Sequence, residues 1–125
     1  MNIRWMAVLT GFLVDVLLTF FIFMFAPPTV SAGSDPTQTS DFILIALGMF
    51  ATGVGGYVAG RMAQTLRPLH GFMVGIVGIL AIQFQLLFGG PTLSRTDVTS
   101  LALGCLLGAV GGLLSRFPAP RRARL

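Results

Sequence analysis

Four long apolar stretches, separated by short polar segments, dominate the pattern of the chain. They cover residues 5–25, 42–60, 69–88 and 98–117. A helix rises about 1.5 Å per residue, so about 20 apolar residues cross the roughly 30 Å hydrocarbon core of a bilayer. The pattern therefore predicts an all-α integral membrane protein, a bundle of four transmembrane helices that forms one domain over residues 1–125. Residues 26–40 are predicted to form a flexible outer loop, and residues 118–125 are predicted to form a basic cytoplasmic tail.

Composition points away from an ordinary soluble domain. Apolar residues make up 54% of the chain and charged residues only 10%, whereas about 25% charged residues is typical of soluble domains. All seven prolines fall outside the four apolar stretches, where a residue without a backbone N–H breaks no helical hydrogen bond. The first stretch also has features of a secretory signal, with a small-residue cleavage pattern at Val30-Ser31-Ala32. Its apolar run is longer than a usual signal core of about 7–15 residues and is interrupted by Asp15, so we expect it to be retained as a helix.

The basic residues, all arginines, lie mainly on one side of the predicted bundle. Short cytoplasmic loops are enriched in Lys and Arg, which fixes the orientation of a membrane protein. Both termini are therefore expected in the cytoplasm, with the four helices in a prokaryotic inner membrane. The arginines of this side are also candidates for contacts with anionic lipid headgroups. Seven of the eight arginines belong to this side, namely Arg4, Arg61, Arg67, Arg116, Arg121, Arg122 and Arg124, and only Arg95 lies on the other.

The chain also resembles itself. Residues 45–60 (IALGMFATGVGGYVAG) align with residues 101–116 (LALGCLLGAVGGLLSR), and Asp41 falls on Asp97. A fainter match relates the first and third apolar stretches. The comparison predicts two duplicated helical hairpins, and because both start on the cytoplasmic side they would be parallel repeats.

Small residues recur at four-residue spacing along each apolar stretch. Lipid tails are as apolar as leucine, so helices in a membrane associate through close backbone approach and interhelical hydrogen bonds. The stripes therefore predict the faces on which the helices pack. Their glycines are Gly11, Gly48, Gly56, Gly60, Gly71, Gly75, Gly104, Gly108 and Gly112.

Few residues remain for chemistry, because the chain has one Cys, one His, four Asp and no Glu. Asp15 falls about 15 Å beyond Trp5, near the bilayer midplane, where a carboxyl group must be neutral or hydrogen-bonded. Thr52 falls at a similar depth, and Gln83 falls somewhat further toward the outer face. These three residues form a candidate intramembrane polar site. Cys105 is expected to be a packing residue. For His70 an interfacial or capping role is expected, and axial ligation of a pigment is the alternative.

Two segments in the middle of the chain carry a family resemblance. Residues 55–61 (GGYVAGR) and, after a short loop, residues 70–75 (HGFMVG) resemble small four-span prokaryotic membrane proteins of uncharacterised function. The resemblance implies a four-helix bundle without an established activity.

These patterns contain no catalytic constellation, phosphate-binding loop, metal-ligand cluster or nucleic-acid module. We therefore expect a non-enzymatic membrane protein with no cofactor and no nucleic-acid partner. Its partners would be the lipid bilayer and other membrane helices, so that it acts through helix-to-helix assembly as a homo-oligomer or as an accessory subunit of a larger complex. The alternative is a small transporter or channel component that uses Asp15 to bind protons or cations.

Overall fold

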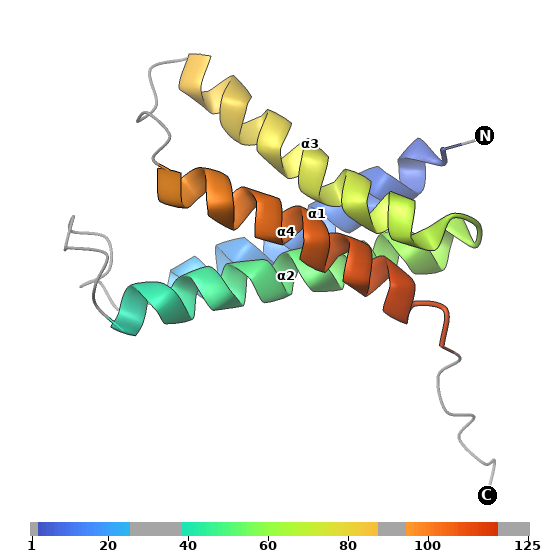
Figure 1. Ribbon diagram of the computed structural model, residues 1–125, viewed down its shortest axis with the longest axis horizontal. Coiled ribbons are helices and arrows are strands. Elements are labelled where there is room, and N and C mark those ends of the chain that lie inside the picture. The colour runs from blue at the N-terminus through green and yellow to red at the C-terminus, as the bar shows by residue number, and fades with distance from the viewer. Residues whose placement is uncertain (1–2, 26–38, 88–94, 118–125) are drawn as a thin grey trace, which may run out of the picture.

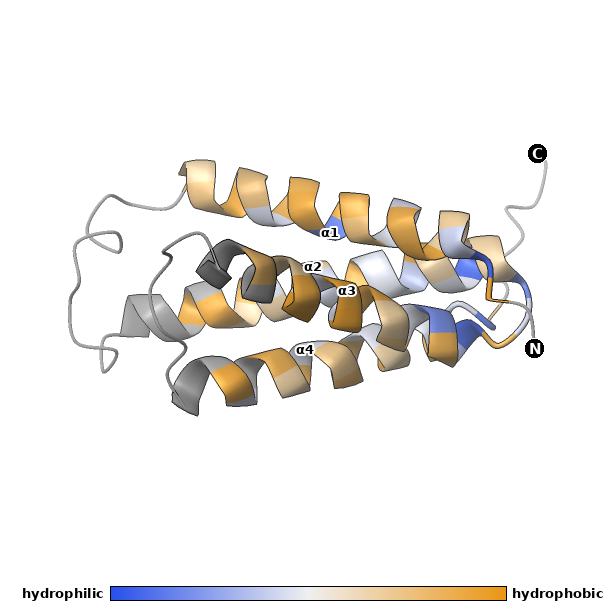
Figure 2. Cartoon of the chain, turned by 90° about the horizontal axis from the view of Figure 1, so that it is seen from above, coloured by the Kyte–Doolittle hydropathy of each residue, from blue (hydrophilic) through white to orange (hydrophobic). Residues whose placement is uncertain are grey.

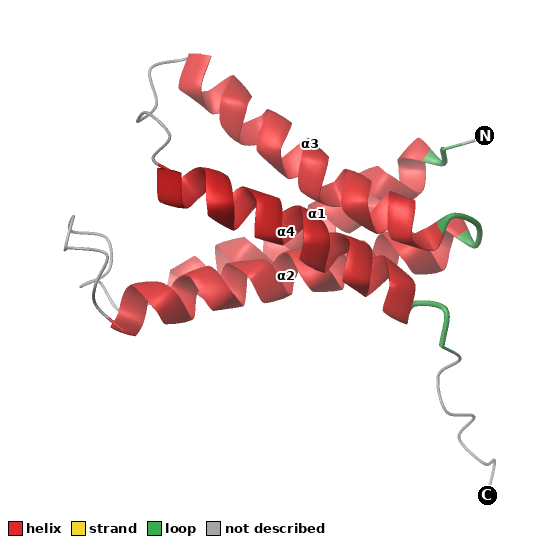
Figure 3. Ribbon diagram, in the orientation of Figure 1, coloured by secondary structure: helices red, strands yellow, loops and turns green. Residues whose placement is uncertain are grey.

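The computed structural model describes residues 3–25, 39–87 and 95–117, which form four α-helices and no strand (Figures 1 and 3). The all-α, four-helix prediction is confirmed for this part of the chain. Residues 26–38 of the predicted outer loop and the predicted cytoplasmic tail, residues 118–125, lie outside it, whereas Thr39 and Ser40, predicted in the loop, begin a helix. The helices are α1 (Trp5–Phe25), α2 (Thr39–Ala63), α3 (Arg67–Leu87) and α4 (Arg95–Leu114).

The helix bounds differ from the predicted apolar stretches where polar residues continue a helix. Helix α2 begins before its apolar stretch, at Thr39, and continues past Gly60 to Ala63. Pro68, which we expected outside the helices, lies in the first turn of α3, where its missing N–H has no intrahelical acceptor. Helix α4 ends three residues early because Arg116 and Phe117 donate backbone hydrogen bonds to carbonyls three residues back, which tightens the last turn.

Helices α2 and α3 lie between α1 and α4, as Figure 2 shows from above. Helix α1 packs against α2 and, over a shorter length, against α3, whereas α4 packs against both α2 and α3. The first turn of α1, the last turn of α4 and the connection Gln64–Leu66 lie at the same end of the bundle (Figure 1). This arrangement brings Arg4, Arg67 and Ser115 together although they are distant in the sequence.

Burial is confined to one half of the bundle. Every residue described as buried falls within residues 4–15, 51–75 or 105–117, which we call the closed half. Its apolar core is formed by Val8, Ala59 and Val74. In the remainder of the helices, the open half, every residue whose burial is described is exposed or partly exposed. The helices therefore converge at the connection Gln64–Leu66 and separate toward the opposite end, as α3 and α2 do in Figure 1.

Among the described residues, α1 alone is both long and apolar enough to cross a membrane. Only 11% of its most apolar window is buried inside the bundle, so α1 is unlike the core helix of a soluble protein. Shorter apolar segments occur in α3, over Arg67–Ala81, and in α4, over Leu101–Leu114.

Candidate functional site

The polar side chains buried in the described part of the chain are Asp15, His70 and Ser115. All three lie in the closed half, and none of their buried nitrogen or oxygen atoms lacks a hydrogen-bond partner. A buried polar group without a partner costs about 1–3 kcal/mol, so these bonds matter for the stability of the bundle.

Asp15 and Thr52 form the polar pair at the centre of the bundle. The Thr52 hydroxyl lies 3.2 Å from Oδ1 and 3.3 Å from Oδ2 of Asp15, and it also lies 3.3 Å from the carbonyl oxygen of Gly48. Asp15 is 9% exposed. The structure therefore brings together two of the three residues predicted to form the intramembrane polar site. The third, Gln83, lies in α3, but its side chain is outside the described part of the chain.

This geometry fits two protonation states of the carboxyl group. When Asp15 is ionised, the single hydroxyl hydrogen of Thr52 bonds to a carboxylate oxygen. When Asp15 is protonated, it donates its own hydrogen to the Thr52 oxygen, and the Thr52 hydroxyl donates to the carbonyl of Gly48. A rotation of one hydroxyl group connects the two arrangements, and no helix has to move.

Asp15→Asn is expected to change the free energy of unfolding by less than about 1 kcal/mol, because the amide keeps a donor and an acceptor and such bonds in membranes average about 0.6 kcal/mol. The measurement is unfolding of the purified protein in mixed detergent micelles. Thr52→Val is the matched comparison. It keeps the shape of the side chain but removes the Thr52 hydroxyl and leaves Asp15 with only its side-chain hydrogen bond to Thr19, so it should be the more destabilising change. A loss in Asp15→Asn larger than that in Thr52→Val would show that the charge itself is required.

His70 ties three parts of the closed half together. Its side chain is completely buried. Its Nε2 accepts the backbone N–H of Arg4 at 3.0 Å, and its Nδ1 lies 3.0 Å from the carbonyl oxygen of Leu66. Because Nε2 must accept, Nδ1 carries the hydrogen and the ring is neutral. The ring thus joins the start of α1 to the connection before α3, and neither nitrogen is left for the pigment ligation considered above.

The connection between α2 and α3 has a restricted backbone. Gln64 and Leu66 have φ angles of 62° and 48°, in a region where side chains other than glycine are uncommon. Leu66 is held by three donors, since its carbonyl accepts from His70 Nδ1 and from the backbone N–H groups of Leu69 and His70. Arg67 Nε donates to the carbonyl of Gln64 at 3.2 Å. Neighbouring hydrogen bonds therefore stabilise this otherwise unfavourable turn.

Arg67 also closes the end of α4. Its Nη1 donates to the carbonyl of Ser115 at 2.6 Å, where the last carbonyls of a helix lack partners and a positive charge is favourable. The Ser115 hydroxyl donates to the carbonyl of Gly112 at 2.6 Å. Ser115 was not predicted from the sequence, and its one signal was its position three residues after Gly112, the last glycine of the α4 stripe.

Glycines bring the helix backbones close together in the closed half. A methyl group at Gly11 of α1 would lie 2.5 Å from the carbonyl oxygen of Gly55 in α2. A methyl group at Gly56 would lie 2.8 Å from the carbonyl carbon of Gly108, and one at Gly108 would lie 2.5 Å from the carbonyl oxygen of Gly71. Three helix pairs, α1–α2, α2–α4 and α3–α4, are thus in contact through their backbones.

The other glycines of the predicted stripes divide between the two halves. Methyl groups at Gly60 and Gly75 would lie 2.5 Å from the Ser115 hydroxyl and 2.6 Å from Cα of Cys105 respectively. One at Gly112 would lie 3.0 Å from the carbonyl carbon of Arg67. At Gly48 and Gly104, by contrast, it would meet no described atom within 4 Å. The packing expected at Gly48 and Gly104 is therefore not found, because the helices have already separated at that level.

The arginines assigned to topology and headgroup contacts have different environments. Arg61 and Arg116 are exposed, whereas Arg67 is partly buried by its bonds to Gln64 and Ser115. Arg121, Arg122 and Arg124 lie outside the described residues. Cys105 is buried in α4 against Gly75. Within the described ranges, no group of three or more His, Cys, Asp or Glu side chains could hold a metal ion.

The chain is thus a small all-α protein whose described residues form four helices, and its buried polar side chains are hydrogen-bonded within the bundle. The chain belongs to the family described as "Protein of unknown function (DUF3792)", which it matches over residues 4–115. The match covers all four helices, and it agrees with the expectation of a family without an established activity. Neither a curated protein nor a solved structure gives a significant match to the chain.

Proposed function

We propose that the protein is a multi-pass inner-membrane protein whose four helices all cross the bilayer, with both termini in the cytoplasm. The observation that carries this proposal is the distribution of side chains between the interior and the surface. The interior of the closed half contains mainly small residues, which are glycine, alanine, valine and one cysteine, together with the three polar groups. Large apolar side chains of every helix are exposed, among them Phe20, Phe50, Phe84 and Leu106. A helix on the surface of a soluble protein has a polar outer face, and a bundle in lipid does not need one.

The contacts of α1 support its retention as part of the bundle. Gly11 is in backbone contact with Gly55, and Asp15 bonds to Thr52. His70 in turn holds the residue before α1. A cleaved signal peptide would remove these partners and leave Thr52 and His70 without them.

The proposed role is non-enzymatic and consists of helix-to-helix assembly, with another copy of the chain or as an accessory subunit of a larger membrane complex. The buried polar side chains that the structure describes use their hydrogen bonds within the bundle. In the open half, large apolar side chains such as Phe20, Phe50 and Phe84 are exposed. Helices of another subunit can cover such surfaces in a membrane.

The shared pattern over residues 55–61 and 70–75 fits this role. Gly55 packs against the backbone of α1, and Gly56 and Gly60 pack against α4 and its end. Gly71 and Gly75 also contact α4. His70 forms the link to α1. We infer that the pattern marks the packing of the closed half and not a catalytic motif.

A mass measurement of the complex purified in mild detergent tests the assembly proposal. A homo-oligomer or a complex with another membrane subunit would support it. A monomer that remains monomeric at high protein concentration and after reconstitution into lipid would contradict it. Any homodimer is expected to be parallel, because seven of the eight arginines belong to one side of the predicted bundle.

Transport through Asp15 is the second candidate function. It is supported by the burial of an acid halfway along α1 and by the hydroxyl of Thr52, whose rotation fits both protonation states. Proton or cation flux in vesicles that contain the purified protein tests this candidate. Flux that is present in the unchanged protein and lost in a folded Asp15→Asn variant would support transport, because an amide cannot ionise. Equal or absent flux in both would contradict it.

The proposed topology gives a direct labelling prediction. In a Cys105→Ala background, Thr37→Cys and Ala123→Cys are expected to react with a membrane-impermeant thiol reagent from opposite faces of oriented membrane vesicles. Thr37 follows α1 and Ala123 follows α4, so an odd number of crossings separates them in the four-span arrangement. Labelling of both residues from the same face, with intact vesicles verified by a lumenal marker, would contradict four spans.

A further inference from the structure

Three helices carry, at or next to their closed ends, an exposed arginine and an exposed aromatic residue. The two residues of each pair are one or four positions apart in the sequence. Trp5 is 58% exposed, Tyr57 37% and Phe117 67%. Tyr57 and Arg61 are four residues apart, so they lie on the same face of α2. The pairs are Arg4 with Trp5, Arg61 with Tyr57, and Arg116 with Phe117.

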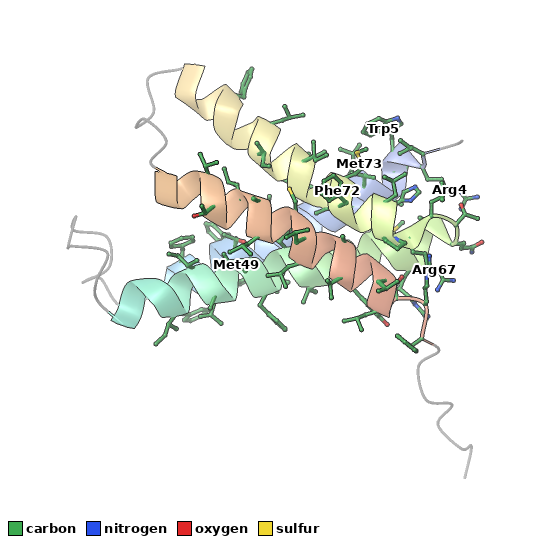
Figure 4. The ribbon with its side chains drawn as sticks, viewed as in Figure 1. Arg4, Trp5, Met49, Arg67, Phe72 and Met73 are labelled. Atoms are coloured by element: carbon green, nitrogen blue, oxygen red, sulfur yellow. The ribbon has the colours of Figure 1, made fainter. Side chains whose placement is uncertain are left out.

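The fourth arginine of this end differs from these three. The Arg67 guanidinium group makes two hydrogen bonds within the chain. Its Nε donates to the carbonyl of Gln64, and its Nη1 donates to the carbonyl of Ser115. Within the described residues, the side chains of Arg4, Arg61 and Arg116 make no hydrogen bond or ion pair. Figure 4 shows Arg4, Trp5 and Arg67 at the same end of the bundle.

No acidic side chain balances these charges among the described residues of the closed end. Asp15 lies midway along α1, and Asp41 and Asp97 lie in the first turns of α2 and α4, at the opposite end. Three guanidinium groups without a described partner therefore lie at an end where the described residues contain no carboxylate. An anionic partner from outside the chain is the electrostatic complement of this surface.

A phospholipid headgroup provides that complement at the required depth. A guanidinium group binds phosphate oxygens through two parallel N–H donors, and aromatic rings favour the boundary between headgroups and acyl chains. Each exposed pair presents one group of each kind. A soluble anion would bind the arginine but would not account for the exposed aromatic ring of each pair.

We propose that the closed end binds anionic phospholipid headgroups through Arg4, Arg61 and Arg116, each paired with its aromatic residue, while Arg67 stabilises the fold and takes no part. The inference rests on the proposed membrane location. It narrows the headgroup role predicted from the sequence by removing Arg67 from it.

Binding of phosphatidylglycerol to the detergent-purified full chain, measured by native mass spectrometry, tests the proposal. Phosphatidylcholine serves as the neutral lipid, and inorganic phosphate serves as the soluble anion. Arg4→Gln, Arg61→Gln and Arg116→Gln are each expected to lower the affinity for phosphatidylglycerol about fivefold, since a basic residue near an anionic surface contributes about 1 kcal/mol. Arg67→Gln is the matched control. It should lower the melting temperature and change the lipid affinity by less than about twofold.

Different results would overturn different parts of the argument. Equal affinity for the two lipids in a protein that needs detergent for extraction would overturn the headgroup site and leave the membrane location intact. Occupancy by inorganic phosphate equal to that by phosphatidylglycerol would replace the lipid with a soluble anion. A larger loss of lipid affinity in folded Arg67→Gln than in Arg61→Gln would contradict the assignment of the arginines. Recovery of the protein in aqueous buffer without detergent would overturn the membrane location itself. The corresponding Arg→Lys variants keep the positive charge and are expected to retain the preference for the anionic lipid.

Discussion

Gly108→Ala is expected to destabilise the bundle, whereas Gly104→Ala, one turn away on the same stripe of α4, is expected to leave it unchanged or slightly more stable. The added methyl group at Gly108 would lie 2.5 Å from the carbonyl oxygen of Gly71, so α3 and α4 must separate. Such overpacking typically costs about 1–3 kcal/mol. At Gly104 the same group meets no described atom within 4 Å, and alanine favours a helix over glycine by about 1 kcal/mol in water.

Unfolding of the two variants in mixed detergent micelles measures this difference. Gly108→Leu should have a larger effect than Gly108→Ala, because the longer side chain cannot fit between two backbones in contact. The pair of alanine variants has the same change of composition and hydropathy, so only the local environment of the two glycines separates them. Equal stability of both would mean that α3 and α4 are not in close contact at Gly71.

His70→Ala is expected to be the most damaging single change at the connection between α2 and α3, with a loss of about 2–4 kcal/mol in the free energy of unfolding. It removes a completely buried ring together with both of its hydrogen bonds, to Arg4 and Leu66. It also removes one of the bonds that hold Leu66 at a positive φ angle.

His70→Leu separates packing from hydrogen bonding. Leucine fills most of the space but leaves the Arg4 N–H and one bond of the Leu66 carbonyl unsatisfied, so its cost should be smaller than that of His70→Ala. The exposed variant Thr10→Ala serves as a control, because the Thr10 hydroxyl bonds only to Met6 of its own helix. A His70→Ala protein as stable as Thr10→Ala would show that the ring does not hold the start of α1 in place.

The sequence predicts the helices well because length and apolarity determine them locally. It also predicts the contact between Asp15 and Thr52. Asp15 was placed by counting about 1.5 Å per residue from the cytoplasmic start of the first stretch, and Thr52 by counting from the outer start of the second. Both counts end near the midplane, and two polar groups at one depth in an apolar bundle can form a hydrogen bond. The stripe on α4 similarly predicts that Gly108 and Gly112 pack closely.

The sequence does not predict where along the helices that packing ends. Gly48 and Gly104 continue their stripes without a break, yet neither has a described neighbour. The angle at which helices separate depends on contacts made elsewhere, and a four-residue repeat does not contain that information. We expected His70 at the membrane interface, and the sequence does not predict its burial. The ring is covered by the start of α1, which is distant from His70 in the sequence. Gln64 and Leu66 gave no turn signal either, since neither is a glycine or an asparagine.

The confinement of buried contacts to the closed half turns that end into a pivot. Helix α3 extends beyond Gly75, its last buried residue, by about 12 residues, or about 18 Å. Over that length a tilt of about 10° at the pivot displaces the far tip by about 3 Å. Small angular fluctuations near His70 and Gly75 are thereby magnified at the opposite face of the bundle, and none of the described buried contacts has to break.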